Sequence, residues 1–157
     1  MRMICGVFWL LICISSPIAS GAESTPSKAS LCDLQRVAKE GEQRSVQVTG
    51  VYSAGLDMGV LTAPACPSQQ TWVELDLQSP ANKEKLRSVL DSKGRADVVF
   101  EGEFFGPARP DPNLPEAIRK SYHPGWGHLG AFKTKLVVHE IRSVKAGKES
   151  AAKAKTV

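Results

Sequence analysis

Several features that would identify a function are missing from this sequence. Only 6% of its 157 residues are aromatic, and none of the sequence patterns of serine hydrolases, zinc peptidases or P-loop proteins occurs. No CxxC pair is present, and one apolar stretch alone, at the N-terminus, approaches the length of a membrane span. The length suits one domain with one modest core and excludes a large multi-domain enzyme.

The N-terminal apolar stretch predicts export. Residues 1–22 have the three-part layout of a secretory signal peptide: a basic start at Arg2, an apolar run over 4–14, then small residues. Cleavage after Ala22 or after Gly21 fits the small-residue rule. The alternative is an uncleaved membrane anchor, for which the run is short against a span of about 20 residues. We expect a secreted or periplasmic protein.

Two of the four cysteines remain once this leader is removed, namely Cys32 and Cys66. An even number of cysteines in an oxidising compartment predicts a disulfide, and closing this loop is worth roughly 3–4 kcal/mol in the chain-entropy model. A metal or redox pair is the competing interpretation, and neither CxxC spacing nor a nearby histidine supports it. No cofactor is expected.

The formal charge of +4 is unevenly distributed. Residues 30–144 contain equal numbers of basic and acidic side chains, so the expected folded part is neutral. Residues 145–157 carry four lysines against one glutamate and no apolar face, and they predict a disordered tail. Such a tail can contact an anionic envelope or nucleic acid, although most charged ends are simply solvated.

Local patterns predict five strands and two helices after a polar lead over 23–29. Ser30 and Asp33 suggest a capped helix of about eleven residues that ends at Gly41, and Ser79-Pro80 starts a second helix that Gly94 closes. The strands are expected at 45–53, 56–62, 71–77, 96–105 and 134–144. Alternation and helical spacing predict the following inward residues: Val73, Leu75, Leu77, Leu86, Val89, Leu90, Leu136, Val138, Ile141 and Val144.

This order predicts a mainly β fold, a five-stranded OB-like Greek-key barrel over 30–144, with an N-terminal helix and a helix between strands three and four. Strands one and four share an apolar-x-Gly-x-aromatic pattern around Gly50 and Gly102, where glycine permits a sharp bend. Another small β-barrel or an α+β fold remains open. With its exported start and the Gly-His-Leu before the last strand, the chain resembles small secreted bacterial OB-like β-barrel proteins of unknown function. The resemblance implies a fold without an activity.

The long connection over 106–132 is the most unusual segment. Its second half concentrates aromatic and histidine side chains among glycines, and a loop this long is often functional. The predicted ligand-binding residues are Trp72, Tyr122, His123, Trp126 and His128. In the alternative, Tyr122, Trp126 and Leu129 fold back and plug one end of the barrel.

Three histidines raise the question of a metal site. His123 and His128 are five residues apart in a glycine-rich loop, which is not a known pairing, and His139 stands on a strand beyond them. Backbone-bonded or solvent-facing histidines are the simpler interpretation, so no metal ligand is assigned.

Carboxylates alternate with apolar residues on two strands, at Glu74 and Asp76 and at Glu101 and Glu103. This pattern is typical of a solvated outer face rather than a catalytic pair. It also places acidic groups where an OB domain would hold a phosphate chain, which makes nucleic acid an improbable partner.

The sequence favours an exported, non-enzymatic binding or envelope-associated module. Its ligand would be a peptide, a glycan or a small molecule, and its contact surface the 106–132 loop with Trp72. The first alternative is a metal-dependent or hydrolytic protein centred on His123 and His128. The second is a nucleic-acid binder that acts through the basic tail.

Overall fold

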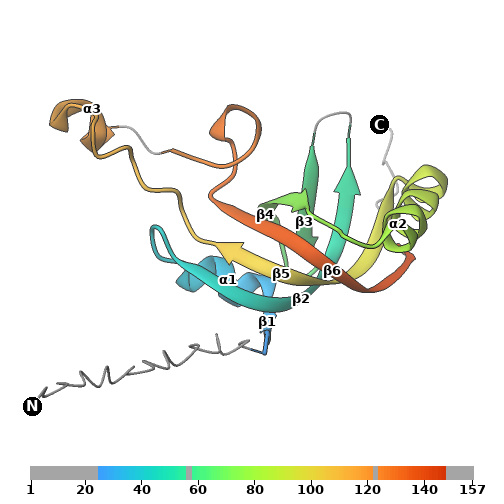
Figure 1. Cartoon of the computed structure of the whole chain (residues 1–157). Helices are drawn as coiled ribbons and strands as arrows, with labels where there is room; N and C mark the ends of the chain where they lie inside the picture. Colours follow the sequence, from blue (N-terminus) through green and yellow to red (C-terminus); the bar gives the residue numbers. More distant parts are fainter. Residues whose placement is uncertain (1–24, 56–57, 122–123, 148–157) are drawn as a thin grey trace, which may run out of the picture.

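Strands dominate the computed structural model, which describes residues 25–55, 58–121 and 124–147 (Figure 1). The leader expected at 1–22 lies outside the described residues, as does the tail from 148 onwards. None of the helices in the described ranges is long and apolar enough to cross a membrane. The elements in chain order are β1 Ser27–Ser30, α1 Leu31–Val37, β2 Gln43–Ala54, β3 Gly59–Ala63, β4 Cys66–Leu75, α2 Pro80–Lys93, β5 Arg95–Phe105, α3 Glu116–Ser121, the 3-10 turn η1 His128–Gly130, and β6 Thr134–Ala146.

Five strands close into a barrel, which confirms the predicted mainly β architecture. The strand order is β2-β3-β4-β6-β5, and a further ladder between β2 and β5 closes the sheet. All the pairings within the barrel are antiparallel except that of β4 with β6. The short strand β1, which the sequence did not predict, pairs in parallel with residues 46–49 of β2.

The barrel interior is filled by alternate residues of the strands. Along β5 every second residue is buried, including Phe100 and Phe104, and the Phe100 ring packs edge-on against Tyr52 at a centroid distance of 5.5 Å. The four residues predicted to point inward from β6 are all buried. These four residues are not evenly spaced along β6. The register between β5 and β6 shifts twice, before Phe100 and after Glu101, and each shift leaves one residue of β6 without a partner in β5.

Glycine permits the close strand contacts that the repeated pattern predicted. A β-carbon on Gly102 would lie 1.9 Å from the main-chain oxygen of Val137, and one on Gly50 would lie 2.6 Å from the oxygen of Thr62. Both glycines stand in paired strands, since β2 and β5 are neighbours in the barrel. Any side chain at these positions would force neighbouring strands apart.

Helix α2 begins and ends at the predicted residues. Ser79 Oγ accepts the N–H of Asn82, Pro80 occupies the first turn, and Gly94 closes the helix in the left-handed conformation with φ of +67°. Leu86 is buried, while Val89 and Leu90 are half-buried against the core. Most of the predicted apolar stripe therefore covers the barrel.

Helix α1 is shorter than predicted and is not capped by Ser30. The helix ends at Val37, and Ser30 makes no side-chain capping hydrogen bond. The reason is that Ser30 also belongs to β1, where its main chain pairs with Thr49 of β2. Leu31 and Leu34 are nevertheless buried, whereas Val37, where the helix ends, is 49% exposed.

Some strand boundaries and one inward prediction were wrong. β3 begins at Gly59 rather than at 56, and β4 begins at Cys66, in the stretch expected to be a loop. Leu75 is 39% exposed although Val73 beside it is buried, because Leu75 borders an open cavity next to α2. β6 runs to Ala146, two residues into the segment expected to be the tail.

Candidate functional site

Trp72 and Trp126, two of the predicted ligand contacts, lie on the outer surface of the barrel. Trp72 of β4 pairs in register with Lys135 of β6. The Trp126 ring centre is 4.4 Å from the Lys135 ammonium, and the ring packs against Phe105 at 5.8 Å between centroids. The ammonium is also 5.0 Å from the Phe105 ring, so Lys135 is enclosed by aromatic rings and its side chain is only 15% exposed.

Further contacts join the two tryptophans into one cluster. Phe132 packs against Trp72 at a centroid distance of 5.4 Å, and Gly127 lies so close to Trp72 that a β-carbon would be 2.4 Å from the indole. Glu74 accepts hydrogen bonds from Trp72 Nε1 at 3.1 Å and from Lys135 Nζ at 3.2 Å. This aromatic latch, which fastens the long loop onto the sheet, consists of Trp72, Phe105, Trp126, Phe132 and Lys135.

The long loop is also fastened where it leaves β5. The main-chain N–H of Gly41 donates to Pro107 at 2.8 Å, and that of Gly106 donates to Glu42 at 2.9 Å. Trp126 Nε1 donates to the Gly106 oxygen at 2.8 Å, which ties the end of the loop to its beginning. Between these fixed points the segment that carries α3 projects away from the barrel (Figure 1).

The turn beneath the loop is held by a carboxylate. Glu42 Oε2 accepts the main-chain N–H of Lys39 at 2.9 Å, and Glu42 also pairs with the guanidinium of Arg44. The hydrogen bond from Lys39, together with Arg44, lowers the pKa of Glu42 below its usual value, against a smaller opposing effect of burial.

The loop does not plug the barrel through Leu129, since that side chain is 91% exposed. Trp126 packs on Phe105, whose neighbour Phe104 points into the interior, so the indole lies outside the barrel wall. Tyr122 lies outside the described residues. The barrel is filled by the side chains of its own strands, and the aromatic residues of the loop fasten the loop itself.

The structure describes two of the three histidines, and they have different surroundings. His128 is exposed in η1, and His139 on β6 lies with Nδ1 3.4 Å from an oxygen of Asp76. His123 lies outside the described residues. Within the ranges that the structure describes, no three histidine, cysteine, aspartate or glutamate side chains are grouped as a metal site would require.

Glu101 and Glu103, the two outward carboxylates predicted on β5, each have a separate partner. Glu101 accepts from Arg142 Nε at 2.7 Å, and this hydrogen bond raises the pKa of the Arg142 guanidinium. Glu103 accepts from Gln43 at 2.8 Å. These contacts are those of a charged outer face, and they do not pair the two carboxylates with each other.

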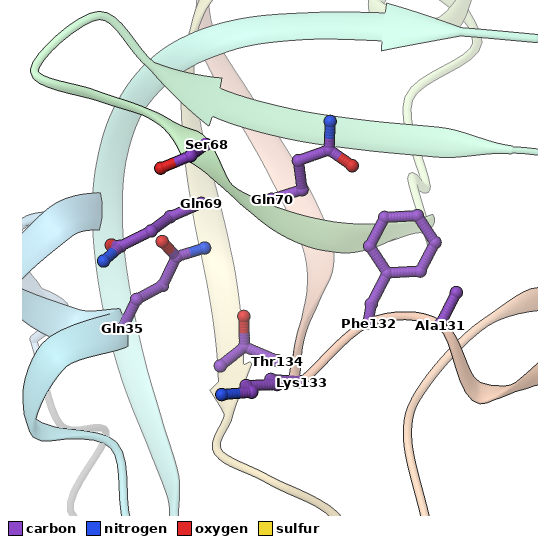
Figure 2. A pocket seen from close by; sticks show the side chains of 8 residues that line it. All are labelled: Gln35, Ser68, Gln69, Gln70, Ala131, Phe132, Lys133 and Thr134. Carbon is purple, nitrogen blue, oxygen red and sulfur yellow. The ribbon is translucent and has the colours of Figure 1, made fainter.

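A polar cavity of about 360 Å³ opens beside the latch, between α1, the first half of β4 and the start of β6 (Figure 2). Its volume lies within the range of small-molecule sites. Amide, hydroxyl and ammonium groups predominate around it, with one aromatic ring. The lining residues are Gln35, Ser68, Gln69, Gln70, Ala131, Phe132, Lys133 and Thr134.

One side-chain atom at this cavity lacks a hydrogen-bond partner. Gln35 Nε2 donates to Thr71 Oγ1 at 2.5 Å, and Thr71 Oγ1 lies 2.8 Å from Thr134 Oγ1, so a buried polar chain runs beneath the cavity. The other end of the amide, Gln35 Oε1, is the one buried side-chain nitrogen or oxygen of the described residues without a partner. An unpaired buried acceptor is costly, and it marks a place for a donor.

A disulfide joins two walls of the cavity. Cys32 of α1 and Cys66 of β4 are bonded, as the sequence predicted. Gln35 follows Cys32 by one helical turn, and Ser68 follows Cys66 by two residues. The covalent bond therefore fixes the distance between the helix that carries Gln35 and the strand that carries the opposing amides.

Three larger cavities lack this feature. One of about 690 Å³ lies between α2 and the end of β2, with Leu75 on its surface, and one of about 580 Å³ lies between the two ends of the long loop. A third, of about 630 Å³, lies at the turn from α2 into β5. None of them is lined by a buried, unpaired polar atom among the described residues. The polar cavity is therefore the candidate site.

Sequence reasoning missed the amides of this site. Gln35, Gln69 and Gln70 belong to segments that read as a short helix and a loop, and glutamine has no spacing rule that would have linked them. Comparison of the chain with protein-family models, curated proteins and solved structures finds no match. The geometry of the cavity is therefore the evidence for what the protein binds.

Proposed function

We propose that the protein is an exported, non-enzymatic binding module on an OB-like Greek-key barrel, similar to small secreted bacterial proteins of that class. Its ligand is a glycan, held in the polar cavity. The strand order, the parallel pairing of β4 with β6 and the position of α2 between β4 and β5 support the OB-like assignment.

Export is supported by the composition of residues 1–22 and by the disulfide, because such bonds persist in oxidising compartments. Cleavage after Ala22 would leave the new N-terminus a few residues before β1. That strand would then still be free to pair with β2 in the mature protein.

The unpaired oxygen of Gln35 carries the proposal for the ligand. This oxygen is closed to solvent in the free protein, so a ligand hydroxyl or amide N–H reaches it only when the Gln35 side chain turns toward the cavity. A neutral molecule rich in hydroxyl groups suits a wall made mainly of carboxamides, because both kinds of group donate and accept. The Phe132 ring adds an apolar face for the C–H side of a sugar ring.

A strand-like peptide fits the site less well. In β4 the register with β3 jumps from Gln70 to Cys66, so the residues between them bulge out, and Pro67 has no N–H. Bulges and prolines are the features by which proteins prevent strands from adding to a sheet edge.

Nuclear magnetic resonance titration of the mature chain, residues 23–157, tests the proposal. The probes are the trisaccharide of N-acetylglucosamine, which offers hydroxyl and amide donors, the trisaccharide of glucose, and trialanine as a peptide. We expect a sugar to shift the amide signals of Gln35, of 68–70 and of 132–134. Shifts with trialanine alone, shifts at other surfaces, or no shift with either sugar would contradict the assignment.

Two variants sharpen the test. Gln35→Leu removes the acceptor and should abolish the shifts while the spectrum of the barrel is retained. Gln78→Leu alters an exposed amide between β4 and α2 that does not line the cavity, and it should bind as the parent does. Equal binding by Gln35→Leu would show that the unpaired oxygen has no part in recognition.

A further inference from the structure

The end of the long loop displays a leucine on a rigid turn. Trp126 and Phe132 exchange two main-chain hydrogen bonds, of 2.7 and 3.2 Å, and so form the base of a narrow hairpin. Inside it, Gly130 N–H donates to Gly127 at 3.2 Å. Leu129 stands at the apex and is 91% exposed, the highest exposure of the large apolar side chains that the structure describes.

Leu129 holds a backbone conformation that is unfavourable for a residue with a β-carbon. Leu129 has φ of +56°, and it is the one non-glycine residue with positive φ in the described ranges. Glycine would adopt this conformation without cost, and glycines stand close by at 127 and 130, themselves with positive φ. Leu129 makes no core contact that would compensate, and such strain is concentrated at functional sites.

The same loop is basic, whereas the rest of the fold is acidic. Residues 106–133 contain four basic and two acidic side chains, while residues 30–105 and 134–144 together contain ten basic and twelve acidic ones. On the projecting α3, Arg119 and Lys120 are exposed beside Ile118, which is itself 50% exposed, and Lys120 forms an exposed ion pair with Glu116 one turn earlier. Apolar and cationic side chains are thus displayed together on a segment fastened to the barrel at both ends.

We propose that this loop docks the protein onto an anionic lipid surface. Leu129 and Ile118 enter the interface between headgroups and acyl chains, while the basic residues of the loop, Arg119 and Lys120 among them, stay with the headgroups. Stable attachment of a peripheral protein requires two such signals, apolar insertion and electrostatic attraction. This inference is independent of the ligand in the polar cavity.

The displayed residues favour a lipid surface over a protein partner. A protein interface needs a contiguous apolar patch with a well-packed centre. The loop instead offers two separate apolar side chains, one of them on a short helix with Arg119 and Lys120, which suits a fluid surface that adapts to each of them.

Vesicle co-sedimentation of the mature chain tests the proposal, with vesicles of phosphatidylglycerol and phosphatidylcholine in equal amounts and vesicles of phosphatidylcholine alone. We expect binding to the anionic vesicles, and about a tenfold weaker partition for Leu129→Ser, from the apolar area withdrawn from the bilayer. Val37→Ser removes an apolar side chain of 49% exposure on α1 and serves as the matched control, with less than a twofold change expected.

A second variant separates insertion from attraction by the lysine tail. The fluorescence of Leu129→Trp should shift to the blue on anionic vesicles and should be quenched by brominated acyl chains. A protein held only by its tail would show neither effect. Leu129→Gly, which also relieves the positive φ, should lose partition like Leu129→Ser while remaining folded by circular dichroism.

Three results would overturn the proposal. One is that the parent binds neither kind of vesicle. Another is that Leu129→Ser binds anionic vesicles as the parent does, which would leave the tail as the source of binding. Alternatively, sedimentation without vesicles would reveal a dimer that Leu129→Ser abolishes, so that a second copy covers the apex.

Discussion

Replacing Gly102 with alanine tests the closure of the barrel directly. The added β-carbon would lie 1.9 Å from the oxygen of Val137 and 2.9 Å from the Val138 α-carbon. Both contacts are with the main chain of β6, so no side-chain rotation relieves them and the two strands must separate. Overpacking of this kind costs about 1–3 kcal/mol, and a clash with backbone belongs at the upper end.

An opposing effect arises in the unfolded state, where alanine has less conformational freedom than glycine and favours folding by about 0.4–1 kcal/mol. The net loss of unfolding free energy for Gly102→Ala is therefore about 2 kcal/mol. With a urea dependence of about 2 kcal/mol per molar, the unfolding midpoint falls by about 1 M.

Urea unfolding followed by tryptophan fluorescence and by circular dichroism measures this shift. Gly55→Ala is the matched control, because a β-carbon there has no atom within 4 Å and only the unfolded-state effect applies. Its midpoint should stay equal or rise slightly. If Gly102→Ala unfolds at the same urea concentration as Gly55→Ala, the strands are not in contact at this glycine and the reasoning is refuted.

Three further predictions concern the disulfide, the latch and one carboxylate. Replacing both Cys32 and Cys66 with alanine should lower the unfolding free energy by about 3–4 kcal/mol in urea titrations, because the bond spans 34 residues of chain; a loss below 1 kcal/mol would contradict this. Lys135→Met removes the enclosed ammonium, so the amide of Trp126 should exchange hydrogen faster while the barrel exchanges as before, and unchanged exchange would show that the latch does not hold the loop. The lowered pKa of Glu42 stabilises the fold above the unfolded-state pKa, and this contribution is lost as the pH falls through the folded-state pKa. Glu42→Gln should therefore destabilise at neutral pH and progressively less in acid, and a loss that does not change with pH would rule out this linkage.

Local chemistry allowed much of the fold to be predicted. The boundaries of α2 followed from Ser79, Pro80 and Gly94, whose capping roles depend only on neighbouring residues. The inward residues of β6 followed from apolar spacing, even though the reason for that spacing, the register shifts opposite β5, was not visible in the sequence.

Contacts between distant segments changed several predictions. Ser30 was expected to cap α1, and instead its main chain pairs with β2, because a strand neighbour far along the chain competes for the same residue. Trp126 was expected to touch a ligand or plug the barrel. It lies outside the barrel wall and packs over Lys135, a pairing that depends on how β5 and β6 are placed side by side, and its contact with a ligand stays a prediction.

By itself the sequence determined the strand-rich architecture, the α2 helix and the pairing of Cys32 with Cys66. These features depend on residue type, on spacing and on the number of cysteines available. Only the tertiary structure decided that Gln35, Thr71 and Thr134 form one buried polar chain and that Gln35 Oε1 is left without a donor. Those residues come from three elements far apart in the chain. They meet only because β4 and β6 pair in parallel and a disulfide holds α1 against them.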